Sequence, residues 1–548
     1  MDKETLSKYG WVVIVIIVLV ILMSFAAPFG NYFSNSTMAI LDSLTNVMAG
    51  EAGFIDADKI FSEHFGSINN SDSSATTSYT LEEIEADEHL YAIGKTQPEY
   101  VVAEFNDDYT EVTITKNGEK SDGLMIDWSK TNPSPMKNNS ATLKFASIKN
   151  GVTSIGNQAF AYCDLLEEIK ITNNIISMGD YTFRGCKTLK DIKIPDNVTL
   201  IGEYTFGDCE SLIDIKIPNG VTLINDGAFD NCKSATDVTI PNSVTSIGRY
   251  AFQRMNALTN MYFNGTADDW VKIDFESESS NPMYYAENEY FNNVLIKDIV
   301  LSKDINGYAF DFCNSLTEVV ILDSVTMIGE RAFYECSELT KVTMSDNITS
   351  IGNEAFAFCE KLSGITIPNG VITIGDYAFK WCKKIEKIII PNSVTLIGKG
   401  AFSSCSSLTE AIVGNGVKII DEYTFDSCSR LRNITIPNSV ASIGEYAFNN
   451  CSSLTNIIIP SSVKTIGDNA FYSCSNITSI IIPDGVTMIG EKTFRGCHKL
   501  KDITIPNSVT SISTSAFEYC VALTTFYGTS GSYAETYATE NGYTFIAI

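Results

Sequence analysis

A single 23-residue period runs through most of this chain of 548 residues. Phenylalanine marks the period, and every step between marked positions is 23 residues except one step of 58. The marked residues are Phe160, Phe183, Phe206, Phe229, Phe252, Phe310, Phe333, Phe356, Phe379, Phe402, Phe425, Phe448, Phe471, Phe494 and Phe517. Such self-similarity is the signature of a repeat protein in which each unit packs on its neighbours.

All 14 cysteines of the chain follow the same period. Each stands three residues after a marked phenylalanine, from Cys163 to Cys520, and Met255 takes this place in the one exception. The wide spacing excludes a Cys-x-x-Cys metal site, and no metal or cofactor is expected. We expect a column of buried, reduced thiols, because free cysteine is among the most buried residue types. Disulfides between stacked neighbours are the alternative, which requires a specific approach of the Cβ atoms.

One unit is well represented by Ile436–Thr455, which reads IPNSVASIGEYAFNNCSSLT. In the strand that follows, Ile457 and Ile459 alternate as inward residues. We expect Gly467 to turn the chain because glycine tolerates positive φ. The Ala-Phe-x-x-Cys segment around Phe471 has helical or 3₁₀ spacing, which predicts one short turn pointing inward.

These strings, such as IPNSVTSIGRYAFQRMNALT at Ile240–Thr259, resemble the BspA-like leucine-rich repeats of bacterial and some protist surface proteins. The resemblance implies an α/β repeat solenoid: a right-handed leucine-rich-repeat array of 23-residue coils with a parallel sheet and an N-terminal β cap. The family is associated with cell-surface adhesion and with host or matrix binding. It has no shared catalytic residue, so the resemblance implies a protein that is not an enzyme.

Seven segments are predicted along the chain. They are a signal-anchor or transmembrane segment (1–33), a Ser- and Asn-rich stalk (34–78), a β-rich N-terminal cap (79–146), repeats (147–263), an aromatic and acidic insert (264–297), repeats (298–527) and a C-terminal cap (528–548). A cap is needed because an open first coil exposes an apolar face and a sheet edge. Within the N-terminal cap, Asn117 and Gly118 predict a two-residue hairpin turn.

The N-terminal segment contains 17 uncharged residues, Trp11–Ala27. With its flanks it is long enough to cross a bilayer of about 30 Å. Lys3 and Lys8 precede it, which predicts a cytoplasmic N-terminus, a plasma-membrane anchor and repeats on the cell surface. A cleaved signal peptide is the alternative and gives a secreted protein.

The charge balance is strongly acidic, with 38 Lys and Arg against 66 Asp and Glu, a net charge of −28. This excludes a nucleic-acid partner bound through a basic patch. The chain has 3 histidines, and none lies in a catalytic motif such as HExxH. Binding is therefore the leading function, and we expect a protein or glycan ligand on another cell or in the matrix.

The outward face of the strands and the insert supply the candidate binding surface. The candidate partner-binding residues are Lys170, Lys193, Lys216, Tyr262, Trp270, Tyr284, Tyr285, Ile389, Ile412, Ile458 and Ile481. The isoleucines predict an exposed apolar stripe, although β-branched residues also simply suit a strand. The insert is either a divergent coil with a packed loop or a binding protrusion. A passive structural spacer with a pilin-like anchor and no specific ligand is the alternative function.

Overall fold

The computed structural model describes residues 78–548 apart from residue 120. These residues belong to the second of two compact units, which spans Thr76–Ile548. The predicted anchor at 1–33 and the predicted stalk, except residue 78, lie outside the described residues. Within the described part of the chain, no helix is long and apolar enough to cross a membrane.

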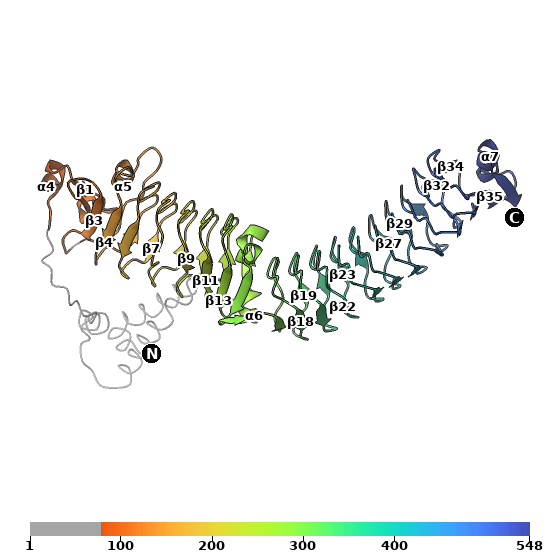
Figure 1. Cartoon of the computed structure of the whole chain (residues 1–548), viewed down its shortest axis with the longest axis horizontal. Coiled ribbons are helices and arrows are strands. Elements are labelled where there is room, and N and C mark those ends of the chain that lie inside the picture. The colour runs from red at the N-terminus through yellow and green to blue at the C-terminus, as the bar shows by residue number, and fades with distance from the viewer. Residues whose placement is uncertain (1–77, 120) are drawn as a thin grey trace, which may run out of the picture. The chain divides into compact units, whose positions relative to one another are not determined.

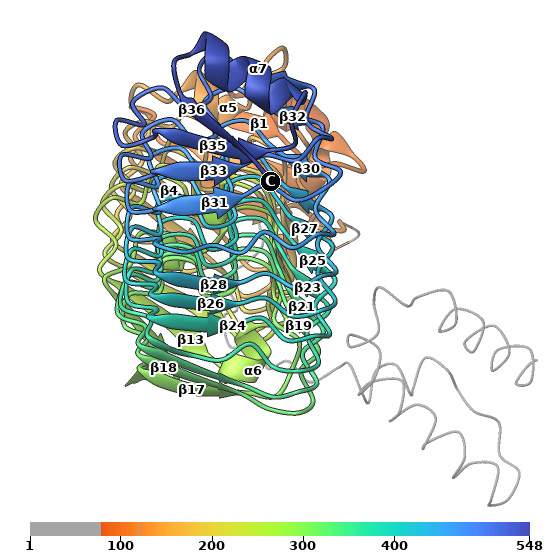
Figure 2. The same ribbon diagram turned by 90° about the vertical axis from the view of Figure 1, so that its right-hand side faces the viewer.

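Most coils contain two strands (Figure 1): one of two to five residues, called here the longer strand, and one of two residues. Residues 23 apart pair in parallel, as Val238 pairs with Ile215 in the longer strands and Ile247 with Ile224 in the shorter ones. Figure 2 shows the two kinds of strand as separate columns. The predicted parallel sheet is confirmed, and a second parallel sheet of short strands accompanies it.

The longer strands are β4 (Phe145–Ile148), β6 (Glu168–Ile171), β9 (Asp214–Lys216), β11 (Asp237–Pro241), β13 (Asn260–Asn264), β15 (Asn288–Phe291), β17 (Asp298–Leu301), β18 (Glu318–Ile321), β20 (Lys341–Met344), β22 (Gly364–Ile365), β24 (Lys387–Ile389), β26 (Glu410–Ile412), β28 (Asn433–Thr435), β31 (Ser479–Ile481), β33 (Asp502–Thr504) and β35 (Thr525–Gly528). The shorter strands are β5 (Ser154–Ile155), β7 (Ser177–Met178), β8 (Leu200–Ile201), β10 (Leu223–Ile224), β12 (Ser246–Ile247), β14 (Asp274–Phe275), β19 (Met327–Ile328), β21 (Ser350–Ile351), β23 (Thr373–Ile374), β25 (Leu396–Ile397), β27 (Ile419–Ile420), β29 (Ser442–Ile443), β30 (Thr465–Ile466), β32 (Met488–Ile489) and β34 (Ser511–Ile512).

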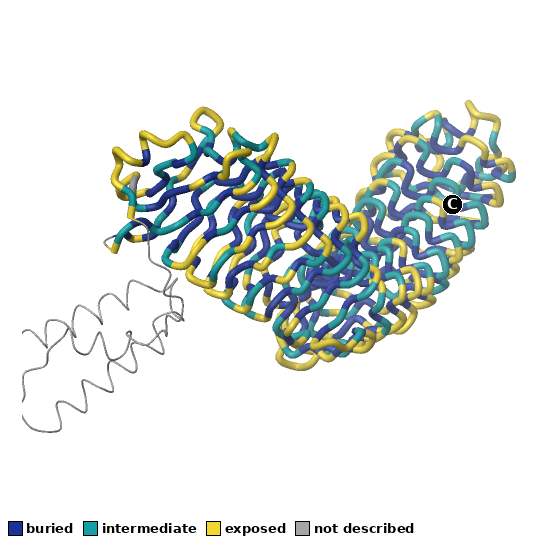
Figure 3. The backbone as a smooth tube through the Cα atoms, turned by 60° about the vertical axis from the view of Figure 1, so that its left-hand side comes forward, coloured by how far each residue is buried: buried dark blue, intermediate teal, exposed yellow. Residues whose placement is uncertain are grey.

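Alternation along each longer strand separates the core from the surface. Ile388 and Ile390 are each 1% exposed, whereas Ile389 between them is 50% exposed. The inward residues of successive coils form one continuous core, and the buried stretches recur from coil to coil in Figure 3. The inward positions predicted from the repeat, including Ile457 and Ile459, are buried.

The Ala-Phe-x-x-Cys segment closes the third side of each coil through consecutive turns. No described coil has the predicted helix or 3₁₀ helix there, so the repeats are all-β rather than α/β. The reason is the backbone: the residues two before and two after the phenylalanine adopt positive φ, as at Tyr377 (55°) and Trp381 (63°). A right-handed helix cannot contain such residues.

The described helices lie in the caps and the insert instead. They are α4 (Leu81–Ala86), α5 (Pro135–Asn138), α6 (Ala267–Trp270) and α7 (Tyr533–Glu540), with the 3₁₀ helices η2 (Pro98–Tyr100), η3 (Glu278–Ser280) and η4 (Pro282–Tyr284).

The side of each coil that the Ala-Phe-x-x-Cys turns form, called here the turn side, has its own ladder of hydrogen bonds between coils. The N–H of Tyr204 donates to the carbonyl of Asp226 at 2.9 Å, and the N–H of Phe206 donates to that of Ala228 at 2.8 Å. The pattern repeats with the 23-residue period, always from one coil to the next. Buried backbone groups on this side are thereby satisfied without a helix.

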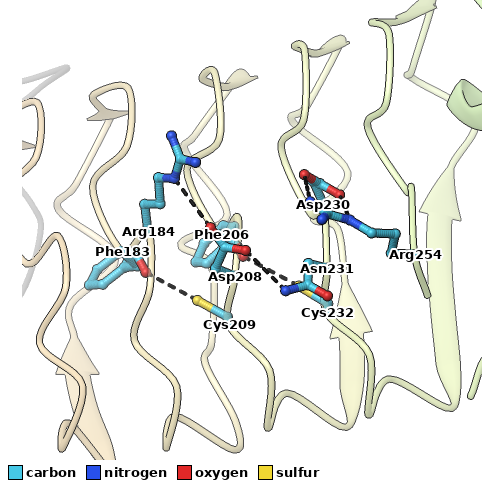
Figure 4. Close-up of polar contacts among 9 residues, drawn as sticks. All are labelled: Phe183, Arg184, Phe206, Asp208, Cys209, Asp230, Asn231, Cys232 and Arg254. Atoms are coloured by element: carbon cyan, nitrogen blue, oxygen red, sulfur yellow. Dashed lines mark hydrogen bonds and ion pairs between the residues drawn. The ribbon is translucent and has the colours of Figure 1, made fainter. Parts of the chain in front are cut away.

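The phenylalanine rings and the cysteines pack directly beneath this ladder. Neighbouring rings are stacked, as for Phe356 and Phe379, whose centroids are 5.4 Å apart with an interplanar angle of 4°. The thiol of Cys209 donates to the carbonyl of Phe183 at 3.1 Å, and the next coil repeats this bond (Figure 4). The same bond to the phenylalanine 26 residues earlier is made by Cys186, Cys209, Cys232, Cys336, Cys359, Cys382, Cys405, Cys428, Cys451, Cys474, Cys497 and Cys520. All 14 cysteines are free and buried, as the period predicts.

The glycine of the Ile-Gly pair has a different role from the one predicted. Gly467 is not among the residues with positive φ. A Cβ atom at this position would lie 2.5 Å from the backbone nitrogen of Glu445 in the preceding coil. Glycine is therefore required by the close approach of two backbones rather than by a left-handed turn.

The N-terminal cap continues the sheet with antiparallel strands. Strands β1 (Leu90–Ala92), β2 (Val101–Phe105) and β3 (Glu111–Lys116) pair antiparallel, and β3 pairs in parallel with β4. The hairpin loop consists of residues 106–110, so the predicted turn at Asn117 and Gly118 is wrong. Asn117 instead uses its side chain to bind the backbone of Tyr79, with both bonds at 2.7 Å.

The two ends of the solenoid are closed by different devices. At the N-terminal end, the hydroxyl of Ser134 donates to the carbonyl of Ala159 at 2.5 Å, where no preceding coil can supply a donor. At the C-terminal end, α7 is followed by β36 (Thr544–Ala547), which pairs in parallel with β35. Both devices protect backbone groups and apolar surface that the outermost coils leave open.

The 58-residue step is built as a divergent coil. Strand β14 pairs with β12, and β15 pairs with β13, so residues 264–291 continue both sheets. Strand β16 (Val294–Leu295) then turns back antiparallel to β15 and ends that sheet, and β17 begins the next. Of the two interpretations of the insert, the structure has the divergent coil.

The insert also acts as an internal cap for the coils that follow it. The indole Nε1 of Trp270 donates to the carbonyl of Ala309 at 2.5 Å, and the amide of Asn281 donates to the same carbonyl at 3.1 Å. Ala309 precedes Phe310 as Ala159 precedes Phe160, so the insert supplies the donor that Ser134 supplies at the N-terminal end. The solenoid thus consists of two runs of coils, each with its own cap.

A buried acid lies at the junction of the two runs. Glu289 on β15 takes the inward position opposite Met261 and is 0% exposed. The hydroxyl of Ser315 donates to its Oε2, and its Oε1 has no partner among the described residues. Burial raises the pKa of Glu289.

The cysteine column predicts strongly suppressed thiol reactivity in the native protein. Burial raises the pKa of Cys405 to about 12, and most of the cysteines are 0% exposed. We expect alkylation by iodoacetamide to modify Cys520 first, because it is 7% exposed on the last coil, and the other thiols only in denaturant. Mass spectrometry of the alkylated peptides measures this order, and paired cysteines in the native protein contradict it.

The capping role of Trp270 predicts a large stability effect. Because the side chain is 0% exposed, Trp270→Ala is expected to lower the free energy of unfolding by about 3–5 kcal/mol in urea denaturation. Trp270→Phe keeps an aromatic ring but removes the N–H donor and part of the buried volume, and it is expected to cost less than Trp270→Ala, about 1–3 kcal/mol. The control is Trp381→Ala, whose side chain is 37% exposed; equal losses at the two tryptophans contradict the internal cap.

Because Glu289 is buried, its replacement by glutamine is predicted to stabilise the protein by an amount that depends on pH. Its folded pKa is raised, so the unfolded chain releases the proton first, and stability falls as pH rises from the unfolded pKa to the folded one. Glu289→Gln is therefore expected to raise the melting temperature at pH 7, with the gain vanishing below about pH 4. The exposed Glu287 gives the control Glu287→Gln, and equal shifts for both variants count against the prediction.

Candidate functional site

A groove of about 1150 Å³ lies on the outward face of the longer strands, over β20, β22, β24, β26 and β28. Each of these coils contributes one residue to its floor. The floor residues are Thr343, Thr366, Ile389, Ile412 and Thr435. They occupy the outward position of their strands because their neighbours on either side point into the core.

One wall of the groove is a row of asparagines that recurs at the 23-residue period. The row consists of Asn369, Asn392, Asn415 and Asn438, each directly after a proline or glycine. The N–H of Asn415 donates to the side-chain oxygen of Asn392 at 2.8 Å, so this oxygen holds the turn of the next coil. Among the described residues, none of the four side-chain Nδ2 atoms has a hydrogen-bond acceptor, and all four residues are exposed.

The groove is almost free of charge. Of its 24 lining residues only Lys341 and Asp346 are charged, and both belong to its first coil. The whole chain, in contrast, has 19% charged residues and a net charge of −28. The lining also contains no histidine, cysteine, glutamate or tyrosine, so it offers shape and hydrogen bonds but no acid and base pair.

The structure places the four predicted isoleucines on this face. Ile389 and Ile412 lie in the groove, and Ile458 and Ile481 follow at the same position in later coils, with 82% and 67% of their surfaces exposed. Sequence reasoning missed the asparagine wall. Its signal was present, because asparagine after proline or glycine recurs at the same period as the isoleucines.

The predicted lysines and Tyr262 lie on the same face of the first run of coils. Lys170 pairs with Glu168 at 3.4 Å, and Lys216 pairs with Asp214. Lys193 is exposed at the equivalent position between them. Tyr262 is half-buried and stacks on Tyr290, with the centroids 5.0 Å apart, and burial raises its pKa. The outward position that carries these lysines and Tyr262 is therefore mostly charged or aromatic in the first run, and the equivalent position is uncharged in the second run. The face of the second run still carries ion pairs nearby, such as Lys387 on β24 with Glu410 on β26 at 2.9 Å.

Among the predicted insert residues, Trp270 is a correction. Its side chain is fully buried against Phe263 and Phe275, so it cannot contact a partner in the folded protein. The structure does not bring Tyr284 and Tyr285 to the sheet face: they lie half-buried on the turn side. There Tyr284 begins a column of neighbouring aromatic rings. The column continues through Phe312, Tyr334, Phe358 and Trp381.

The buried acids near the insert lie away from the groove. Asp311 is 0% exposed and faces Arg331, whose Nη2 is 3.4 Å from its Oδ2. Arg331 also reaches Glu278 at 2.7 Å and stacks over the ring of Tyr334 at 3.8 Å. Burial raises the pKa of Asp311. A carboxyl group that no solvent reaches is placed for packing rather than for contact with a substrate.

Comparison with known proteins gives matches to repeat proteins. A crystal structure of a leucine-rich repeat protein from Bacteroides ovatus is 26% identical and covers 82% of this chain and 98% of its own, with a TM-score of 0.46. A leucine rich cell surface protein from Faecalibacterium prausnitzii is 31% identical and covers 59% of this chain and 89% of its own, with a TM-score of 0.38. A search of the curated proteins finds no match.

A family model supplies the assignment. The model described as BspA type leucine rich repeat region (6 copies) matches residues 137–268, 303–432 and 418–541. No catalytic family is indicated by this match. Because the matched ranges cover more than half of the chain, the protein belongs to the BspA-type leucine-rich repeat family.

Proposed function

We propose that this protein is a non-catalytic cell-surface protein that binds a protein or glycan partner through the outward face of its longer strands, in adhesion or in contact with a host or matrix. The observation that carries the proposal is the row of exposed isoleucines on this face. Ile389, Ile458 and Ile481 are 50%, 82% and 67% exposed. Several exposed apolar residues on one face of a soluble domain are typical of an interaction site.

The proposed location rests on the family and on the N-terminal sequence. One similar solved structure is named a leucine rich cell surface protein. Residues 1–33 are proposed to anchor the chain in the plasma membrane, with residues 34–78 as a stalk and the repeats outside. The uncharged run Trp11–Ala27, preceded by Lys3 and Lys8, supports this orientation.

The binding role of the sheet face predicts a loss of attachment when the row is made polar. In cells that display the full chain, replacing Ile389, Ile412, Ile458 and Ile481 with serine is expected to reduce attachment to host cells or matrix by about tenfold or more, because several apolar contacts are lost together. A quantitative cell-attachment assay measures the change.

The short-strand face supplies a matched control. Met327, Leu396, Ile419 and Met488 are the exposed first residues of short strands, at 43%, 55%, 51% and 53%. Their replacement by serine is expected to leave attachment unchanged. Unchanged attachment for the isoleucine set, with normal display on the surface, favours the passive spacer instead.

A further inference from the structure

The groove repeats itself along the array. Floor and wall are translated from coil to coil, because the strands that carry them pair in register with a 23-residue offset. Neighbouring strands in a sheet are about 4.8 Å apart, so equivalent groups recur at about that distance. A ligand that makes the same contact with each coil is a linear polymer with a repeating unit. An extended sugar chain advances by a comparable distance per residue.

The charge of the groove restricts the polymer. The four coils that contribute residues 363–438 line the groove without one charged residue. A polyanion would meet one lining cation, Lys341 at the end of the groove, because the nearby Lys387 is already paired with Glu410, and it would be repelled by a chain with a net charge of −28. A polycation would have to give up its hydration along a lining whose one carboxylate, Asp346, lies in the first coil. A neutral polymer avoids both costs.

The hydrogen-bonding groups of the groove suit hydroxyl groups. The asparagine Nδ2 atoms of the wall are free donors, and the hydroxyls of Thr366 and Thr435 on the floor can donate or accept. Ile389 and Ile412 lie between these hydroxyls and offer an apolar surface to the C–H groups of a sugar ring. The isoleucines thus offer an apolar surface, and the threonines and asparagines offer hydrogen bonds, which matches the two kinds of surface that a sugar chain presents.

The same surface is less suited to binding an extended peptide. A peptide that adds to a sheet uses unpaired backbone groups at a sheet edge. The backbone groups of β24, β26 and β28 are already paired with one another. The groove lies over the face of these strands and offers a peptide only side chains.

We propose that the groove over β20–β28 binds a linear, neutral polysaccharide that lies across successive coils, with its ring faces on Ile389 and Ile412 and its hydroxyls on the asparagine wall. The proposal rests on the proposed function, because it names the ligand class of the same face.

The asparagines can also be explained by turn formation alone, and the experiment must distinguish this explanation from ligand binding. Asparagine after proline suits a turn by its local hydrogen bonding alone. Asn219 and Asn242 occupy the same position in the first run of coils, outside the groove. They provide a matched control for the wall.

The test is affinity electrophoresis of the full-length protein through gels that contain mixed-linkage β-glucan, xylan or glucomannan, with hyaluronan and polygalacturonate as polyanions. Retardation by at least one neutral polymer and by neither polyanion is expected. The Asn392→Ala, Asn415→Ala double variant is expected to weaken the retardation about tenfold, and Asn219→Ala, Asn242→Ala to leave it unchanged.

A conservative substitution on the floor distinguishes a loss of binding from a folding defect. Thr366→Val removes one hydroxyl and keeps the shape of the side chain, and it is expected to weaken binding severalfold at an unchanged melting temperature. Thr239→Val is its control in the first run, and its binding is expected to stay unchanged. Retardation by none of the neutral polymers, retardation by polyanions alone, or equal losses in the control variants each overturn the proposal.

The outcome is distinguishable from a failure of the proposed function. If the isoleucine-to-serine set abolishes attachment while no neutral polymer retards the protein, the face binds a partner of another class and only this inference fails. Periodate treatment of the target cells, which cleaves sugar rings, is expected to abolish attachment if the polysaccharide is the ligand. Attachment that survives this treatment also overturns the inference.

Discussion

On the phenylalanine side of each coil, backbone N–H groups at alternate positions all donate toward the following coil, and the carbonyl groups all face the preceding one. This one-way ladder gives the solenoid a direction. Its first coil has carbonyls without donors, and an unsatisfied buried backbone group costs about 1–3 kcal/mol. Ser134 meets this need at the N-terminal end, and Trp270 and Asn281 meet it at the start of the second run.

The cysteine column follows from the same ladder. The carbonyl of each marked phenylalanine is buried, and a thiol from the following coil donates to it in most of the array. Cysteine combines a small apolar side chain with a weak donor, and it fits a position where the core is closely packed. This accounts for the recurrence of cysteine at the same position in nearly every unit. The exception, Met255, has no S–H group to donate to the carbonyl of Phe229 in the preceding coil.

The sequence was sufficient to predict the parallel sheet, the inward residues and the outward isoleucines, because these depend on a strict period and on alternation. It did not predict the positive φ values at residues such as Tyr377 and Trp381, because aromatic residues rarely adopt them and only the ladder between coils enforces them. The role of Gly467 was also missed, because the constraint is the backbone of Glu445, 22 residues earlier in the chain.

Within the candidate site, the isoleucine row could be predicted from the period, whereas the burial of Trp270 could not. An aromatic residue in an insert is equally compatible with a protrusion and with a cap, and only the contact with Ala309 separates them. The asparagines of the wall recur at the 23-residue period, but asparagine after proline or glycine is also common in turns. The sequence alone therefore does not distinguish a turn residue from a residue that lines a groove.

The two caps make the length of this protein adjustable. Because each run begins with its own set of donors, a whole coil can be gained or lost within one run without disturbing the start of the other. An in-frame duplication of one unit lengthens the array by one strand spacing and leaves every hydrogen-bond register intact. The length of each run can therefore change over evolutionary time without a change in the caps.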